Sequence, residues 1–243
     1  MKKIAALTIG LLLTASAAMA AGVNLYVGDC GGGTSTNSFT NACTKNSGSG
    51  AAAVTLVASV VLDNTDPDFI GAATIIDLQS SASSLPAWWD GSSTGCRSGS
   101  ISANENSNIS PDCPTLWDGR SDVLPVFAVQ PLVGGPNRVR FNSGAAITSS
   151  IPILGGGTEY GVMSLVVNYA KTVGTGACAG CSTGACIVLN EINLQPASTT
   201  TPWTRFTAPA TNNFVTFQAG APVCAGSTPT ANHSWGSLKA LYR

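Results

Sequence analysis

Residues 53–62 read AVTLVASVVL, a short apolar run in which valine is the commonest residue. The turn-forming sequence DNTDPD follows at 63–68, and a second β-branched run, AATIIDL, occupies residues 72–78. Short β-branched runs separated by Asp, Asn and Pro are typical of strands joined by turns. The two runs therefore predict a pair of consecutive β-strands.

The same pattern continues along the chain. Further runs are VLPVFAVQ (123–130), NRVRF (137–141), YGVMSLVVNYA (160–170), CIVLNEINL (186–194) and NFVTFQ (213–218). We find no internal repeat, no heptad pattern and no alternation of strands with helices. Seven to nine strands with loops of uneven length predict an all-β fold, a jelly-roll-like antiparallel β-sandwich in one domain over residues 21–243.

Two of these runs indicate which side chains face the core. In NRVRF, Arg138 and Arg140 alternate with apolar residues, so both arginines are predicted to face outward. In the run at 186–194, strict alternation would put Leu189 on the same face as Glu191. That strand is therefore predicted to have apolar and polar side chains on both faces.

Residues 1–20 have the three parts of a cleavable secretory signal peptide. Lys2 and Lys3 form a basic start, residues 4–13 an apolar core, and Ala-Met-Ala at 18–20 a cleavage sequence. An uncleaved membrane anchor is the alternative, but it would need nearer to about 20 apolar residues. We expect a mature chain that is extracellular or at the cell surface, with the periplasm also open, and no membrane insertion after cleavage.

Charge is scarce throughout the chain. Only 9% of residues are charged, against roughly 25% in an average domain. Without the two lysines of the signal peptide, nine basic residues stand against twelve acidic ones, a net charge of −3. This composition disfavours nucleic acid and anionic membranes as partners.

All eight cysteines follow the signal peptide, and an even number in an exported chain predicts four disulfides. Polar loops lie between Cys30 and Cys43 and between Cys96 and Cys113, so each of these pairs is predicted to form a local bond. The other four cysteines have three possible connectivities; they are Cys178, Cys181, Cys186 and Cys224.

The CAGC sequence at 178–181 has sharper alternatives. A thioredoxin-like pair would need a helix start after a strand, and a zinc site is disfavoured in an oxidising compartment. Covalent haem is excluded because Ser182 stands where the histidine of a CxxCH motif must be. Structural disulfides are the favoured interpretation.

Two Trp-Asp-Gly segments flank the cysteines at 96 and 113. Trp88, Trp89 and Asp90 precede the first, and Trp117 and Asp118 follow the second. Aromatic rings beside carboxylates can bind sugars, because the ring stacks on pyranose C–H groups while the acid accepts from hydroxyls. The segments therefore predict a glycan-binding platform, with core packing of the indoles as the favoured alternative.

Asp63, Asp66 and Asp68 are the one candidate metal site, because Ca²⁺ prefers several oxygen ligands from one loop. Their spacing lacks the regular pattern of an EF-hand. An ordinary solvated turn is the favoured alternative, and no other cofactor is expected.

The C-terminus carries the one helical pattern of the mature chain. Ser234 could cap a short helix that would bring four apolar side chains to one side, namely Trp235, Leu238, Leu241 and Tyr242. Such a surface should pack on its own domain or on another copy. We therefore predict self-association through these residues, with packing on their own domain as the alternative.

The sequence offers little for catalysis. His233 is the single histidine, and no GxSxG sequence accompanies it. A paired-carboxylate site needs only two acids, so Glu105, Glu159 and Glu191 stay open as candidates together with the aspartates.

Three segments resemble a family of uncharacterised, secreted, disulfide-containing β-sandwich proteins from environmental bacteria. They are SLPAWWDGSSTGC (84–96), AKTVGTGACAGCSTGACIVLNEI (170–192) and WGSLKALYR (235–243). The resemblance implies that these cysteines and tryptophans belong to a recurrent scaffold. The resemblance implies no activity for this chain.

The leading hypothesis is a non-catalytic exported β-sandwich that serves as a structural or adhesive component, with itself or a cell-surface component as partner. A carbohydrate-binding module, with glycans as partner, is the second hypothesis. A paired-carboxylate hydrolase is the third.

Overall fold

The computed structural model describes residues 20–31, 35–46, 53–106, 109–110, 112–218 and 224. The predicted signal peptide, apart from its last residue, lies outside the described residues. The predicted C-terminal helix also lies outside them, with His233 and the self-association residues Trp235, Leu238, Leu241 and Tyr242. Within the described ranges, no helix has the length and apolar character that crossing a membrane requires.

The described chain consists mainly of β-strands. They are β1 (Gly22–Val27), β2 (Ser38–Phe39), β3 (Ala53–Leu62), β4 (Asp66–Ser80), β5 (Ile101–Asn104), β6 (Leu124–Pro131), β7 (Arg138–Ile153), β8 (Thr158–Asn168), β9 (Ala185–Pro196), β10 (Thr204–Phe206) and β11 (Phe214–Phe217). One short 3-10 helix, η1 (Ala87–Trp89), lies between β4 and β5.

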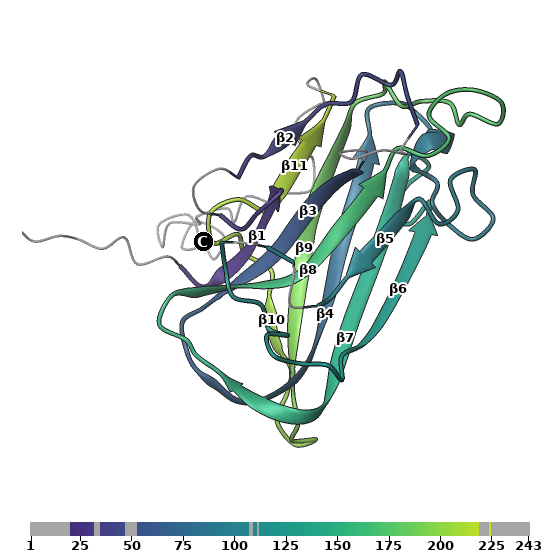
Figure 1. The fold of residues 1–243 in the computed structure, drawn as a ribbon. Coiled ribbons are helices and arrows are strands. Elements are labelled where there is room, and N and C mark those ends of the chain that lie inside the picture. The colour runs from purple at the N-terminus through teal and green to yellow at the C-terminus, as the bar shows by residue number, and fades with distance from the viewer. Residues whose placement is uncertain are drawn as a thin grey trace, which may run out of the picture.

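The strands form two sheets that lie face to face (Figure 1). The smaller sheet has the order β1-β3-β8-β5, and the larger has the order β2-β11-β9-β4-β7-β6, with β10 also paired to β9. The named strands pair antiparallel, except for the short parallel pair of β2 and β11. A hydrophobic core with side chains from both sheets lies between them. The predicted all-β antiparallel sandwich is confirmed.

Each predicted run overlaps a strand of the structure, and the run at 53–62 is β3 residue for residue. The run at 72–78 lies inside the longer β4, which begins at Asp66 because its pairing with β7 starts there. The sequence does not predict β1, β2, β5 and β10. These strands are short, and pairing with their neighbours makes them extended.

A β-bulge at Asn190 interrupts the alternation of β9. Ile76 of β4 pairs with Leu189 and Ile75 pairs with Glu191, so Asn190 has no partner on β4. An extra residue shifts the phase of a strand. As a result, Leu189 and the apolar residues after the bulge all face the core, while Glu191 faces outward. The predicted mixture is therefore wrong for the core face, whereas the outer face carries the apolar Val188 together with Glu191.

All eight cysteines form disulfides, but the two predicted local pairs are wrong. The bonds are Cys30–Cys113, Cys43–Cys181, Cys96–Cys178 and Cys186–Cys224. Between Cys30 and Cys43 the chain extends into β2, which pairs with β11. Between Cys96 and Cys113 it extends into β5, which pairs with β8. Each of these strands carries the second cysteine away from the first.

Three of the four bonds link loops that are distant in sequence, with separations of 83, 138 and 82 residues. The two cysteines of the CAGC sequence bond to different partners outside it. Neither sulfur is therefore available as a redox pair or a zinc ligand. Four disulfides and the absence of a free cysteine among the described residues are typical of proteins in an oxidising environment outside the cytoplasm.

Candidate functional site

The three indoles of the Trp-Asp-Gly segments belong to the core. Trp88, Trp89 and Trp117 are each 0% exposed. A sugar-stacking platform needs an open ring face, and none of these rings has one. All three indoles are therefore packed in the core, as the favoured alternative predicted.

The aspartates of these segments stabilise the turns in which they lie. Asp90 accepts hydrogen bonds from the amide (3.2 Å) and the hydroxyl (2.6 Å) of Ser92. Asp118 accepts from the amide (3.0 Å) and the hydroxyl (3.1 Å) of Thr115. Asp side chains commonly stabilise turns in this way. The predicted glycan platform is therefore not formed by these segments.

Trp88 packs against a buried arginine. The guanidinium carbon of Arg97 lies 3.9 Å from the centroid of the Trp88 ring. Arg97 donates to the backbone carbonyls of Trp88 (2.8 Å), Ala170 (3.1 Å) and Asn168. Burial lowers the pKa of Arg97 to about 10, so it stays charged at neutral pH. These contacts join the β4–β5 loop to the β8–β9 loop at one end of the sandwich (Figure 1). The Cys96–Cys178 disulfide links the same two loops.

The three aspartates of the predicted calcium site line one cleft but do not form a metal-binding group. Asp63 accepts from the amide of Asn64 (2.9 Å), Asp66 from the amide of Asp68 (3.2 Å), and Asp68 from the amide of Ser198 (3.2 Å). In the part of the chain that the structure describes, no group of three or more His, Cys, Asp or Glu side chains could hold a metal ion. The prediction of calcium is therefore wrong for these residues, and the turn alternative fits them.

The three glutamates lie in different surroundings. Glu105 is 6% exposed and accepts from the hydroxyl of Ser143 on the inner face of β7. Glu159 on β8 accepts from the side-chain amide of Asn24 (2.9 Å). Glu191 lies on the outer face of the larger sheet. The structure does not bring these three together as a carboxylate pair.

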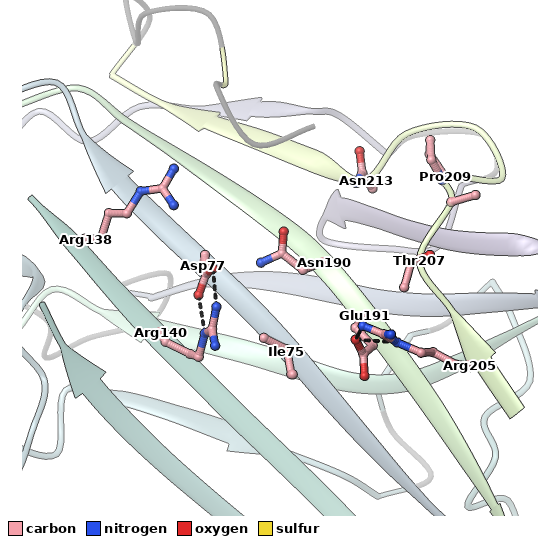
Figure 2. A pocket seen from close by; sticks show the side chains of 11 residues that line it. Ile75, Asp77, Arg138, Arg140, Asn190, Glu191, Arg205, Thr207, Pro209 and Asn213 are labelled. Carbon is pink, nitrogen blue, oxygen red and sulfur yellow. Dashed lines mark hydrogen bonds and ion pairs between the residues drawn. The ribbon is translucent and has the colours of Figure 1, made fainter. Parts of the chain in front are cut away.

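A groove of about 520 Å³ lies on the outer face of the larger sheet (Figure 2). Its lining residues are Ile75 and Asp77 of β4, Arg138 and Arg140 of β7, Asn190 and Glu191 of β9, Arg205 of β10, and Thr207, Ala208, Pro209 and Asn213 of the segment after β10. Five of these eleven residues are charged, in a chain in which only 9% of residues are. The groove is therefore our candidate site.

The groove lies where β9 changes its neighbour. Residues 192–194 of β9 pair with β10, and residues 185–188 pair with β11. The connecting segment 207–213 forms one wall, and the bulged Asn190 lies between the two paired stretches. Bulges often re-aim side chains beside functional sites. Figure 2 shows Asn190 near the middle of the groove, between Asp77 and Glu191.

The wall is fixed to β1 by backbone hydrogen bonds. The Val23 amide donates to the carbonyl of Ala208 (2.9 Å), and the Ala210 amide donates to the carbonyl of Val23 (3.0 Å). A Cβ atom at Gly22 would lie 2.5 Å from the carbonyl oxygen of Ala208. Only glycine at this position permits so close an approach.

A buried side chain also holds the wall. Asn24 is 0% exposed and accepts from the amides of Thr211 (2.8 Å) and Asn212 (3.1 Å) through Oδ1. Its Nδ2 donates to Glu159, which also accepts from the hydroxyl of Ser59 (2.5 Å). This network connects β1, β3 and β8 to the wall of the groove.

Two ion pairs occupy the floor of the groove. Asp77 and Arg140 lie directly opposite each other on β4 and β7, with Nε–Oδ1 and Nη2–Oδ2 distances of 2.7 and 2.8 Å. The hydrogen bonds to Asp77 raise the pKa of Arg140. Arg205 donates from Nε (2.7 Å) and Nη2 to Glu191 Oε2. Opposite charges at facing positions are a common stabilising arrangement on sheets.

The two members of each pair differ in exposure. The side chains of Asp77 and Glu191 are 15% and 13% exposed, whereas those of Arg140 and Arg205 are 32% and 66% exposed. In both pairs the guanidinium group is thus more exposed than the carboxylate. Arg138, which donates to Gln79 (2.8 Å), adds a third guanidinium group to the lining.

The groove therefore presents three cations and two less exposed anions, a local charge of +1 on a mature chain whose predicted net charge is −3. Guanidinium groups donate several hydrogen bonds in one plane and match the oxygens of anions. Such an arrangement can bind an anionic, oxygen-rich ligand.

Part of this site was predictable from the sequence. The outward orientation of Arg138 and Arg140 follows from the alternation of NRVRF and is confirmed. Asp77 is a single acid in an apolar run, which is a usable signal of an outward position. Arg205 lies outside every predicted strand, and nothing in the sequence near it connects it to Glu191.

No protein-family model and no curated protein matches the chain. Among solved structures, the fold is similar to a cohesin module from a family 33 glycoside hydrolase of Clostridium perfringens, with 8% sequence identity and a TM-score of 0.32. The match covers 77% of this chain and 97% of that module. At this level of similarity, the match says nothing about a ligand or partner.

Proposed function

We propose that the mature chain is an exported, non-catalytic β-sandwich that attaches to a cell-surface or extracellular component through the groove of its larger sheet. The observation that carries this proposal is that, in both ion pairs of the groove, the guanidinium group is more exposed than the carboxylate. Strands hold these groups at fixed positions, and rigid elements make more accurate binding surfaces than loops do.

The state of the groove acids favours attachment over catalysis. Both oxygens of Asp77 accept from Arg140, and Glu191 accepts from Arg205. A general acid or base must exchange a proton with its substrate. The oxygens of both carboxylates are already used as acceptors within the protein, because the second oxygen of Glu191 accepts from the side-chain amide of Asn193, so neither acid is free to meet a substrate.

The sheet edge favours attachment through the face. β6 is the last strand of the larger sheet and contains Pro125 and Pro131. Proline lacks the N–H that a new strand would need, so it protects edges against strand addition. Edge-to-edge polymerisation through β6 is therefore disfavoured. Self-association through the C-terminal apolar residues stays a prediction.

Fractionation of the producing cells would test the proposal. We expect the disulfide-bonded mature chain in the surface or extracellular-matrix fraction, released by about 1 M salt because screening weakens exposed charge contacts. Arg120→Gln serves as a control, because Arg120 is also ion-paired but does not line the groove. Arg205→Gln should be lost from the matrix fraction in a low-salt wash that leaves the wild type bound. Equal retention of the two proteins would contradict the proposal. Recovery of the chain in the cytoplasm would also contradict it.

A further inference from the structure

We infer that the groove binds a carboxylated polysaccharide, a polymer of uronic acid type. The inference rests on the proposed attachment function and names its ligand class. It follows from three properties of the lining residues: the outward charge, the neutral polar groups beside that charge, and the absence of aromatic rings among them.

The outward charge selects an anion. Asp77 uses Nε and Nη2 of Arg140, and Glu191 uses the same two groups of Arg205. In the described part of the chain, this leaves Nη1 of both arginines for a ligand. Guanidinium N–H groups bind carboxylates with charge-assisted hydrogen bonds. Their ion-paired acids fix the orientation of both guanidinium groups before a ligand arrives.

The neutral groups select a ligand with hydroxyls. The side chains of Asn190 and Thr207 make no hydrogen bond to other described residues, and both line the groove. An amide and a hydroxyl both donate and accept. Sugar hydroxyls do the same, whereas a carboxylate alone only accepts. A uronic acid residue offers both kinds of group within one ring.

The lining residues also disfavour a single-stranded nucleic acid. None of the residues that line the groove is aromatic, so bases of a single-stranded nucleic acid would find no ring to stack on. The apolar lining residues, including Ile75 and Pro209, can instead contact the C–H face of a sugar ring.

Isothermal titration with polygalacturonate tests the inference, because its methyl ester is the same polymer without the charge. We expect binding to polygalacturonate, at least about tenfold weaker binding to the ester, and affinity that falls as salt increases. Arg205→Gln and Arg140→Gln should each weaken binding by about tenfold or more. Arg120→Gln should bind like the wild type.

Arg205→Gln keeps the test valid if Arg140→Gln folds poorly, because the Arg205 side chain is 66% exposed. Equal binding of polygalacturonate and its ester would overturn the inference, as would affinity for poly-glutamate equal to that for polygalacturonate. No binding to polygalacturonate would also overturn it. If salt-sensitive attachment to the cell surface still depended on Arg205 in any of these cases, the proposed function would stand with a different ligand. If that attachment were also absent, the ligand inference and the proposed function would both fail.

Discussion

Arg97 and Trp88 form a buried cation–π pair, with the guanidinium carbon 3.9 Å from the ring centroid. No salt bridge to Arg97 occurs among the described residues. Backbone carbonyls and the ring face stabilise its charge instead. Both side chains are 0% exposed where the β4–β5 and β8–β9 loops meet, so neither is available to a ligand.

Phenylalanine at positions 88 and 89 provides a matched comparison. The Trp88 indole donates to the hydroxyl of Thr172 (3.1 Å), whereas the Trp89 indole nitrogen has no partner among the described residues. Trp88→Phe should therefore lower the free energy of unfolding by about 1 to 2 kcal/mol more than Trp89→Phe. Urea denaturation measures both. Equal losses for the two variants would show that the hydrogen bond of Trp88 to Thr172 and its contact with Arg97 add nothing to the free energy of unfolding.

The disulfide pairing predicts a specific tryptic digest without reduction. Five peptides should stay covalently joined, those that end at Lys45, Arg97, Arg120, Arg205 and Lys239. Mass spectrometry before and after reduction identifies this product. Local pairing would instead release the peptide that ends at Lys45 with one internal bond, a result that contradicts the structure.

Strand positions were predictable because their signal is local. The β-branched run of β3 and the alternation of Arg138 and Arg140 depend on neighbouring residues alone. The cysteine pairing was not predictable in this way, because β2 and β5 find their partners far along the chain. Loop composition gave no sign that these segments would be extended.

The groove needed information that strand patterns do not contain. Asp77 and Arg140 are 63 residues apart and meet only through the register of β4 and β7. The bulge at Asn190 decides which way Glu191 faces. Neither register nor a bulge follows from the composition of one strand.

Glu105 predicts a pH-dependent stability. Burial raises the pKa of its carboxyl in the folded protein, and the hydrogen bond from Ser143 offsets part of this rise. The unfolded chain therefore ionises first, near its ordinary pKa of 4.5, and folded stability falls as pH rises from there through the raised pKa. Glu105→Gln stays neutral, so it should gain stability over wild type as pH rises from about 4 to about 7. Denaturant titrations at both pH values measure the difference, and a difference that does not change with pH would refute this reading.

Asn24 predicts a coupling between the smaller sheet and the groove wall. Asn24→Asp keeps an acceptor for Thr211 and Asn212 but puts a second carboxylate beside Glu159. We expect a loss of about 2 kcal/mol or more at neutral pH, recovered in part on acidification, because like charges repel and the amide donor is gone. Ser59→Ala removes another donor to Glu159 without adding charge and should cost only about 1 kcal/mol. Unchanged stability of Asn24→Asp at neutral pH would mean that this network does not hold the wall.

The most direct test of the groove as the binding surface is an NMR titration with a short oligogalacturonate that follows the side-chain Nε–Hε signals of the arginines. The account predicts that the signals of Arg138, Arg140 and Arg205 shift together and saturate, while that of Arg120 stays in place. Unchanged signals of the three groove arginines at saturating ligand, or a shift of the Arg120 signal equal to theirs, would contradict it.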